Sequence, residues 1–439
     1  MPPLVGWSIP LGELAVAAQA ASGTRGSPTA PRRTEVQRTS RTPPAGVAQT
    51  EIGFAGRYPL RVSALSGIRV LDFTRVVSGP YCTQLLSDLG ADVVKIERPG
   101  SGDDSRAFGP PFIKGESVYF LSLNRGKKSV VIDLSTETGR QDARRLAREF
   151  DVVIENFRTG FMASVGLDYE TLAADNERLV YCSMTGFGET GPYKDRAGYD
   201  VMVSALGGMM GITGLPGGPP VKTGVALLDV ATGLHAATAI CAALYERARS
   251  GKGQRIELSL LGVQLATLIN AASVYLVGGQ VMGPQGNAHD AIVPYRAFRA
   301  SDGYIVIGAA NDSMFTRLCD VLGVPELAHD RKFDTNANRV AHRQELEVAI
   351  GQRLATATVS EWVGRISAAG VAVAPVNSIR EVFSDPQVVA SGQVVPFVHT
   401  TLGEIQLVGS PVHMSRTPVI HQGAPPILGE HTEEVLGKQ

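Results

Sequence analysis

Short apolar runs alternate with amphipathic segments from about residue 65 to residue 280. The runs with a strand pattern are 68–73, 91–97, 129–134, 151–157, 179–184 and 254–260, and those with a helical pattern are 81–89, 137–150 and 263–277. Strands separated by helices are typical of parallel sheets, because parallel neighbours need a long crossover connection. The pattern therefore predicts an α/β fold with a large, Rossmann-like doubly wound domain.

The pattern changes after a glycine-rich loop at 283–289. Strand-like runs at 294–298 and 303–308 precede helical patterns at 313–322, 343–355 and 359–369. This change predicts a smaller α+β domain over 281–394, beside a large domain over 61–280 that 395–439 completes. Residues 1–60 are rich in Ser, Thr, Pro, Ala and Gly without sustained periodicity, which predicts a disordered tail.

Composition excludes several classes of partner. Hydrophobic residues make up 44% of the chain and charged residues 19%, and the net charge is −1. A chain so nearly neutral has no broad basic field for nucleic acid or an anionic membrane surface, so we expect neither as a partner. The four cysteines are scattered without a CxxC pair, which predicts free thiols, no metal site and a reducing compartment.

That compartment is expected to be the cytoplasm. The alternative is the mitochondrial matrix, because Arg25, Arg32, Arg33, Arg38 and Arg41 give the tail the composition of a transit peptide. The first 24 residues, however, contain no Arg or Lys.

One carboxylate stands between an apolar run and a long helical pattern. A strand-like run at 222–228 ends on Asp229, and an alanine-rich helix then extends to Tyr245. Asp229 has two interpretations at this position. As an N-cap it would stabilise the helix by about 0.5–2 kcal/mol. As a nucleophile it would be held ionised by the helix N-terminus and available for covalent catalysis.

Polar residues follow the predicted strands at Thr74-Arg75, Glu97-Arg98, Asn156-Phe157-Arg158 and Thr185-Gly186. Ligands of doubly wound sheets bind at these carboxyl ends, and arginine binds phosphate with two parallel hydrogen bonds. The basic run 125–128 is more typical of a solvated turn. No G-x-G-x-x-G follows the first strand, which argues against NAD. These residues indicate an α/β enzyme with a phosphate-bearing ligand.

Several motifs, in order along the chain, resemble the class III CoA-transferase family of formyl-CoA and carnitine CoA-transferases. They are Leu65–Asp72, Leu89–Gly100, Gly102–Arg106, Asp151–Phe157, Arg196–Asp200, Gly286–His289 and Leu428–Thr432. Within that family, Gly109–Phe112, Ile292–Tyr295 and Phe333–Asn336 favour the members that use succinyl-CoA and glutarate. The resemblance covers about 370 residues and implies transfer of CoA from an acyl-CoA donor to a free dicarboxylate.

The resemblance also implies roles for individual residues. Asp229 matches the nucleophile, which passes through an aspartyl anhydride and an aspartyl-CoA thioester. The residues matching the CoA site are Arg75, Val76, Arg98, Asn156 and Phe157, to which we add the basic Arg106 and Arg158. The residues expected at the substrate or in a lid are Tyr199, Gly286, Asn287 and His289. The family further implies an interlaced homodimer and a CoA thioester as co-substrate, without a tightly bound cofactor.

Departures from the family pattern narrow the choice of substrate, and two alternative functions remain. Val77 replaces a glutamine of formyl-CoA transferase, and Gly286–His289 replaces its four-glycine loop, which argues against oxalate. The first alternative is a 2-methylacyl-CoA racemase on the same fold. That enzyme needs a histidine where this chain has Tyr199, and tyrosine, with a pKa of about 10, is a poor base at neutral pH. The second is a CoA-binding protein without catalytic activity.

Overall fold

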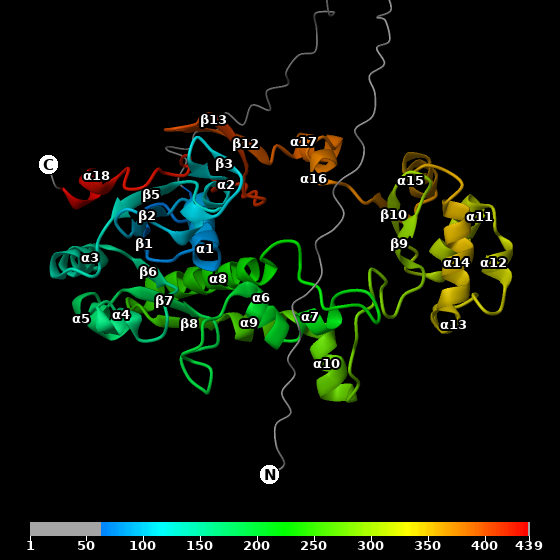
Figure 1. Ribbon diagram of the computed structural model, residues 1–439, viewed down its shortest axis with the longest axis horizontal. Helices are drawn as coiled ribbons and strands as arrows, with labels where there is room; N and C mark the ends of the chain where they lie inside the picture. Colours follow the sequence, from blue (N-terminus) through cyan, green and yellow to red (C-terminus); the bar gives the residue numbers. More distant parts are fainter. Residues whose placement is uncertain (1–62, 438–439) are drawn as a thin grey trace, which may run out of the picture. The chain divides into compact units, whose positions relative to one another are not determined.

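The computed structural model describes residues 63–437, so the predicted disordered tail at 1–60 lies outside the described residues (Figure 1). A six-stranded sheet forms its largest layer, in the order β5-β2-β1-β6-β7-β8, and each neighbouring pair is parallel. The strands are β1 (Arg69–Asp72), β2 (Asp92–Glu97), β5 (Lys127–Val131), β6 (Val152–Glu155), β7 (Val180–Thr185) and β8 (Arg255–Ser259). The predicted parallel α/β sheet is confirmed.

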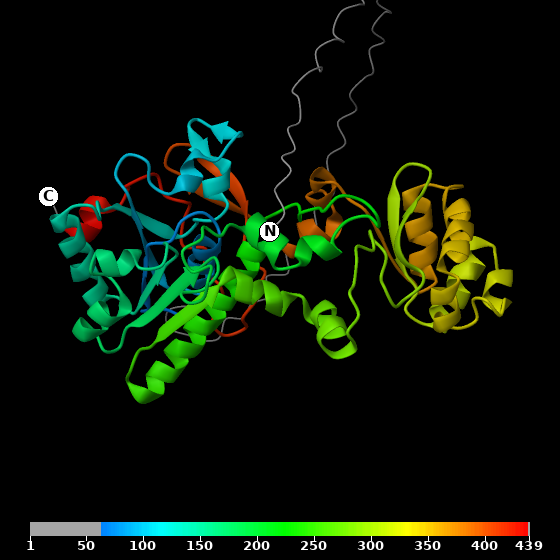
Figure 2. The ribbon, with the colours of Figure 1, turned by 60° about the horizontal axis from the view of Figure 1, so that its bottom comes forward.

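Helices cover both faces of this sheet because successive strand residues point in opposite directions. Val70 and Val93 pack with α1 (Ser78–Asp88) and α8 (Leu227–Ser250), the long helix beside β7 and β8 in Figure 2. Leu71 and Val94, one position further along, pack with helices on the opposite face. Those helices are α3 (Glu137–Glu149), α4 (Phe161–Ser164) and α5 (Tyr169–Asp175).

The strand order reverses between β1 and β6, which places two turns side by side at the carboxyl edge. From β1 the chain proceeds to β2 and β5 on one side, and from β6 to β7 and β8 on the other. The turn after β1 contains Arg75, whose backbone N–H donates to the side chain of Asn156 after β6 at 2.9 Å. Such a reversal opens a crevice at the strand ends, where ligands of open α/β sheets bind.

Two local predictions in this region are wrong. Residues 222–226 form no strand, and Val225 (67% exposed) and Leu227 (50% exposed) do not reach the sheet. The helix predicted at 263–277 is two helices, α9 (Leu260–Thr267) and α10 (Ile269–Gly278), bent by 76°. The bend occurs at Ile269, whose φ of +36° is incompatible with a continuous right-handed helix.

α8 is long and apolar enough to cross a membrane, with a mean hydropathy of 1.6, and the bent pair α9 and α10 passes the same test together. The buried side of α8 includes Ala236, Ile240 and Ala243, which pack against the sheet and α1. Packing of this kind is typical of a helix in a globular core. The expectation of no membrane partner stays a prediction.

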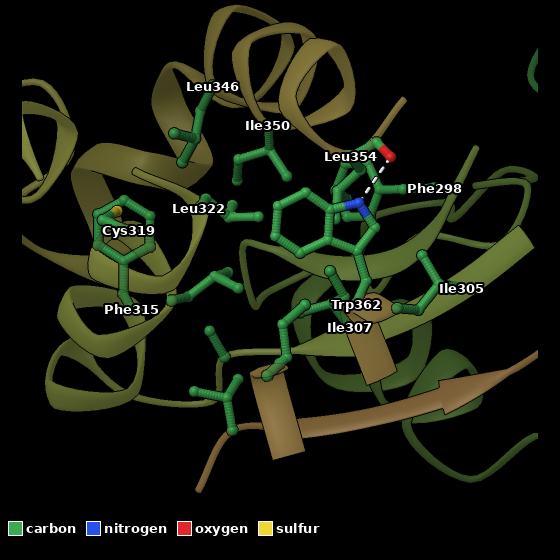
Figure 3. Packing of buried hydrophobic residues seen from close by; sticks show 14 of the residues in the cluster. Phe298, Ile305, Ile307, Phe315, Cys319, Leu322, Leu346, Ile350, Leu354 and Trp362 are labelled. Carbon is green, nitrogen blue, oxygen red and sulfur yellow. Dashed lines mark hydrogen bonds between the residues drawn. The ribbon is translucent and has the colours of Figure 1, made fainter. Parts of the chain in front are cut away.

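A second sheet has its own core. Its antiparallel strands are β9 (Tyr295–Arg299), β10 (Tyr304–Gly308) and β11 (Ala372–Pro375), and its helices are α11 (Asp312–Leu322), α12 (Glu326–His329), α13 (Asn336–Ala341), α14 (Arg343–Leu354) and α15 (Val359–Ala368). Trp362 lies in this core, and its indole N–H donates to the Leu354 carbonyl at 2.8 Å (Figure 3). The elements match the predicted α+β pattern, and the domain boundaries stay a prediction.

The remaining elements connect these parts. They are η1 (Asp104–Ala107), β3 (Phe112–Ile113), β4 (Glu116–Ser117), α2 (Val118–Leu121), α6 (Asp200–Leu206), α7 (Met209–Ile212), α16 (Ile379–Val382), α17 (Pro386–Ser391), β12 (Val394–His399), β13 (Gly403–Val408) and α18 (Thr432–Leu436). The C-terminal segment returns to the parallel sheet, where the His431 N–H donates to the Ser129 carbonyl at 2.9 Å. The Thr432 hydroxyl accepts from the Val131 N–H at 3.0 Å.

Candidate active site

A cavity of about 420 Å³ opens at the carboxyl ends of β1, β6 and β7. It brings together seven of the residues selected from the sequence, which are Arg75, Val76, Asn156, Phe157, Arg158, Tyr199 and Asp229. These residues come from four separate parts of the chain. The reversal of strand order places two of those parts next to each other, and packing of α8 against α1 brings in the nucleophile candidate.

Asp229 is the third residue of α8, and the helix is capped by another element. The N-cap residue is Ala226, which makes no side-chain capping bond. The Asp200 carboxylate at the start of α6 instead accepts hydrogen bonds from the N–H groups of Leu228 (3.0 Å) and Asp229 (3.3 Å). The interpretation of Asp229 as an N-cap is therefore wrong. Its carboxylate is free of capping and faces the cavity.

Two neighbours act in opposite directions on the acidity of Asp229. Burial raises the pKa of its carboxyl to about 6, the hydrogen bond from the Ser78 hydroxyl (3.0 Å) opposes that rise, and the negative charge of Asp200 adds to it. The pKa of Asp229 is therefore raised, although its place in the first turn of a helix favours the ionised form. The carboxylate is still mostly ionised at pH 7, and a carboxylate of higher pKa is the more basic nucleophile.

A close contact between α1 and α8 makes the bond from Ser78 possible. A Cβ at Gly233 would lie 2.7 Å from the Ser78 carbonyl oxygen and 3.1 Å from the Tyr81 ring. Glycine at this position lets the first turn of α1 approach the first turns of α8. Ser78 was not selected from the sequence, because the two residues are 151 positions apart.

Four cations line the cavity, which suits a ligand with several phosphates. They are Arg75, Arg158, Lys194 and Arg196. The Arg75 guanidinium lies 4.6 Å from the centroid of the Phe157 ring and pairs with Asp104 at 3.3 Å. Sequence reasoning did not select Lys194 and Arg196 for the site, although Arg196 begins one of the family motifs. The sequence feature that could have identified them is the presence of two basic residues just before Tyr199.

A smaller cavity of about 200 Å³ adjoins the first through Arg75 and Phe157, which line both. Its apolar wall consists of Phe73, Ile96, Ile132, Leu134 and Phe161. Arg98 lines it too and pairs with Asp104. A narrow apolar cavity with arginines at its mouth suits a flat aromatic ring attached to phosphate.

Four basic or polar residues considered from the sequence are already engaged by protein groups. The Asn156 side chain accepts from the Arg75 N–H and donates to the Arg75 carbonyl, both at 2.9 Å. Arg106 bonds Glu97 at 2.8 Å and is not among the residues lining either cavity. Arg125 and Lys127 are buried and ion-paired, so the solvated turn expected at 125–128 is wrong. Asn156 thus orients the turn that carries Arg75.

The expected lid residues are not among those lining the cavity around Asp229. The Gly286 N–H donates to the Gly214 carbonyl at 2.8 Å, and the Asn287 side chain accepts from the Ala297 N–H. The His289 ring stacks on the Tyr295 ring, with the two ring centroids 5.3 Å apart. Their role as a lid stays a prediction. Tyr199 does line the cavity and is 62% exposed.

Tyr119 on α2 is a further residue that sequence reasoning missed. Burial raises the pKa of its hydroxyl, and the charges of Asp229 and Asp200 raise it further, which places the phenol near both carboxylates.

Within residues 63–437 no group of three or more His, Cys, Asp or Glu side chains is arranged to hold a metal ion.

Comparison with known proteins gives consistent results. A model of CoA-transferase family III matches residues 65–432. Succinyl-CoA:glutarate CoA-transferase of Mus musculus is 44% identical over 372 residues, 85% of either chain. Succinate–glutarate CoA-transferase of Agrobacterium fabrum is 45% identical over 87% of this chain and 96% of its own. The crystal structure of a CAIB/BAIF family protein from Brucella suis superposes with a TM-score of 0.79 at 42% identity, covering 86% of this chain and 99% of that one.

Proposed function

Because this chain belongs to CoA-transferase family III, and so transfers CoA, we propose that it moves CoA from succinyl-CoA to glutarate or a similar dicarboxylate, with Asp229 as nucleophile. The observation that carries the proposal is the uncapped, partly buried Asp229 carboxylate facing a cavity lined by four cations. The relatives named for succinyl-CoA and glutarate support the choice of substrates.

The reaction proceeds in four acyl transfers. The Asp229 carboxylate attacks the thioester carbonyl of succinyl-CoA, which forms a mixed anhydride and releases the CoA thiolate. The thiolate attacks the Asp229 carbonyl and expels succinate, leaving an aspartyl-CoA thioester. Glutarate attacks this thioester to form a second anhydride and release the thiolate again. The thiolate finally attacks the glutaryl carbonyl, which yields glutaryl-CoA and restores the carboxylate.

The two adjoining cavities define the proposed binding mode of CoA. The adenine occupies the smaller apolar cavity, and the phosphates lie near Arg75 and Arg98 at its mouth and near Arg158 in the larger cavity. The pantetheine arm then follows the larger cavity to Asp229. Lys194 and Arg196 remain for the free carboxylate of the dicarboxylate substrate. CoA is a co-substrate in this scheme, and the enzyme needs no tightly bound cofactor.

We also propose that the chain forms the interlaced homodimer implied by the family, with the two domains expected from the sequence. Apolar side chains of α10 are strongly exposed in a single chain, including Leu276 (79%) and Val277 (89%). Apolar surface of this kind is typical of an interface. The cellular location stays a prediction.

Oxygen labelling tests the mechanism. The enzyme is mixed with succinyl-CoA and glutarate carrying ¹⁸O in its carboxylates, and the Asp229 peptide is weighed by mass spectrometry after a single turnover. We expect one ¹⁸O atom in Asp229, because the bridging oxygen of the second anhydride comes from glutarate and stays on the aspartate. Succinate released in later turnovers then acquires that label.

Two results would contradict the proposal. Glutaryl-CoA formed while Asp229 stays unlabelled would show direct transfer between the substrates. A protein that binds CoA but yields no glutaryl-CoA would lack the proposed activity, and loss of stereochemistry in a 2-methylacyl-CoA would then identify a racemase. The control is Asp229→Asn, which should neither transfer CoA nor take up label.

A further inference from the structure

The turn after β1 contains a strained residue. Val76 has a φ of +72°, in the left-handed region that β-branched residues rarely adopt. It lines the cavity between Arg75 and Ser78, the residue that donates to Asp229. Strain of this kind persists only where the surroundings hold the backbone in place. The contacts around Val76 therefore identify the groups that hold its backbone in the left-handed conformation.

We propose that Asp103, held by Lys95, is a positioning residue that fixes the left-handed turn at Val76 and thereby aligns the CoA site with Asp229. The proposal rests on the CoA-transferase function stated above. It adds two residues that line the smaller cavity but not the cavity around Asp229.

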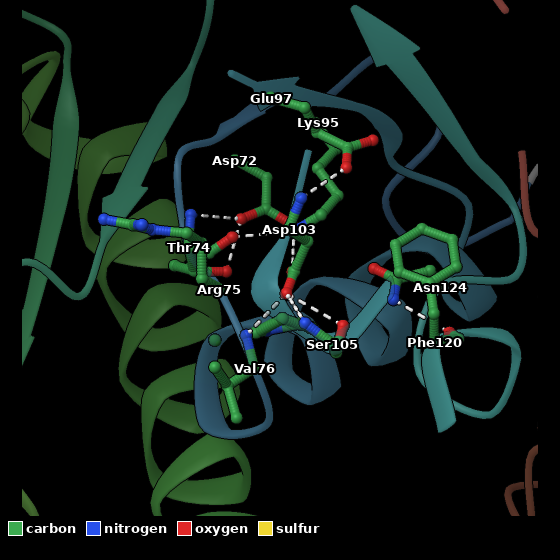
Figure 4. Close-up of polar contacts among 12 residues, drawn as sticks. Asp72, Thr74, Arg75, Val76, Lys95, Glu97, Asp103, Ser105, Phe120 and Asn124 are labelled. Carbon is green, nitrogen blue, oxygen red and sulfur yellow. Dashed lines mark hydrogen bonds and ion pairs between the residues drawn. The ribbon is translucent and has the colours of Figure 1, made fainter. Parts of the chain in front are cut away.

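Asp103 contacts Val76 directly. Its Oδ1 accepts hydrogen bonds from the Val76 N–H (3.1 Å) and from the N–H and hydroxyl of Ser105 (both 2.8 Å). Its Oδ2 pairs with the Lys95 ammonium at 2.8 Å, and both side chains are fully buried. Asp103 itself is anchored, because its N–H donates to Glu97 at 2.8 Å. The carboxylate that holds Val76 is thus immobilised on three sides (Figure 4).

The same buried ions hold the rest of the turn. The Lys95 ammonium donates to the Thr74 carbonyl at 2.6 Å, and the Asp72 carboxylate accepts from the Thr74 N–H at 2.8 Å. Lys127 pairs with Asp72 at 3.3 Å and donates to the Pro80 carbonyl at 2.9 Å. The backbone is therefore bonded to buried charges before, within and after the strained residue. Asn156 adds two bonds at Arg75 from the other side.

The arrangement favours a positioning role over a general contribution to stability. Burial by itself would raise the pKa of Asp103, but the Lys95 charge and the bonds from Ser105 hold it at about 2, so the acceptor stays charged across the working range of the enzyme. A charged acceptor makes a stronger bond to a backbone N–H than a neutral one. That bond is directed at the backbone N–H of Val76, the residue with the left-handed conformation in this turn.

The test is a double-mutant cycle between Asp103→Ala and Val76→Gly. Glycine adopts a positive φ without strain, so the turn in Val76→Gly no longer depends on the clamp formed by Asp103 and Lys95. Isothermal titration with free CoA gives Kd for each variant, steady-state kinetics gives KM for succinyl-CoA and kcat, and thermal unfolding gives Tm. We expect Asp103→Ala to weaken CoA binding about tenfold or more in the Val76 background and only about twofold in the Val76→Gly background.

The matched control is Asp88→Ala. Asp88 forms a buried ion pair with Arg125 at the far end of α1, so its loss also leaves a buried cation without its partner. We expect Asp88→Ala to lower Tm as Asp103→Ala does but to leave Kd for CoA unchanged. If Asp103→Ala alone does not fold, recovery of a folded, CoA-binding protein by adding Val76→Gly supports the clamp, and the cycle is completed with Asp103→Asn.

The inference is overturned if a folded Asp103 variant binds CoA like the wild type, or if its effect on Kd is the same in both Val76 backgrounds. Failure of Val76→Gly to rescue either Asp103 variant overturns it as well. If the wild-type enzyme itself does not bind CoA, the proposed function fails first, which is a distinct result.

Discussion

The reactivity of Asp229 depends on a few contacts around one carboxylate. Burial and the Asp200 charge raise its pKa, the Ser78 hydroxyl lowers it, and the Tyr119 phenol lies near the same charges. Because these groups belong to α1, α2, α6 and α8, the acidity of the Asp229 carboxyl depends on how the four helices pack. Two predictions follow from its pKa, one for activity and one for stability.

The pH dependence of kcat/KM tests the activity. In the proposed mechanism only ionised Asp229 attacks the thioester, so we expect activity to fall below an apparent pKa of about 6. Ser78→Ala removes the hydrogen bond that stabilises the ionised carboxylate and should move the acid limb of the pH profile to higher pH. Asp200→Asn removes the repelling charge and should move it to lower pH. Shifts of both variants in the same direction would contradict the assignment.

The stability of Asp229→Asn tests the same pKa without catalysis. The folded carboxyl has a pKa of about 6 against 3.8 for the unfolded group. Its ionised form therefore costs stability above about pH 6, and the cost disappears below 3.8. We expect Asn to raise the free energy of unfolding at pH 8 by about 1–3 kcal/mol, with a much smaller gain at pH 4.5. Urea denaturation measures both values, and equal stability at pH 8 would contradict the burial argument.

Among the helices, the contact between α1 and α8 decides whether Ser78 reaches Asp229. The contact depends on Gly233, where a side chain would meet the Ser78 carbonyl. Gly364 in α15 provides a comparison, because a Cβ there would meet nothing within 4 Å. The two glycines occupy similar helical positions and differ in what lies opposite them.

Alanine at each glycine separates helix propensity from packing. Gly364→Ala should stabilise the protein by about 0.5–1 kcal/mol, since alanine favours a helix interior. Gly233→Ala should instead lose about 1–3 kcal/mol through overpacking and reduce kcat by pushing Ser78 from Asp229. Urea denaturation and steady-state rates of both variants measure these effects. Normal activity and higher stability of Gly233→Ala would show that α1 does not need this contact.

At the scale of the whole molecule, α10 presents an exposed apolar face that we expect to lie in an interface. It contains Tyr275, Leu276 and Val277, which are 59–89% exposed in the single chain. α10 projects from α9 across a 76° bend, so these side chains are carried away from the core that α9 joins.

Light scattering on a sizing column tests the dimer. We expect the wild type to have twice the mass of one chain. Leu276→Lys combined with Val277→Lys should shift the protein toward the monomer, because burying two charges in an apolar interface is costly. The control, Gln141→Lys, adds a charge on the exposed face of α3 and should not change the mass. A monomeric wild type would contradict the dimer.

The sequence by itself determined the elements whose signal is local. Runs such as 68–73 and 91–97 predicted parallel strands, because side-chain alternation and strand length depend only on adjacent residues. Parallel strands end at one edge, so Arg75, Asn156 and Phe157 could be expected together. The resemblance to the family then pointed to Asp229 as the proposed nucleophile, a role that its position at the start of a helix alone left open.

Only the tertiary structure decided how those elements meet. Asp200 replaces Asp229 as the cap, and Ser78 reaches Asp229 across 151 positions. Lys95 and Lys127 form buried ion pairs, although Lys127 belongs to a run expected to be a solvated turn. The strained turn at Val76 gives no local signal, since valine itself disfavours it. Such features depend on distances between atoms far apart in the chain, which packing sets and the spacing of residues in the sequence does not reveal.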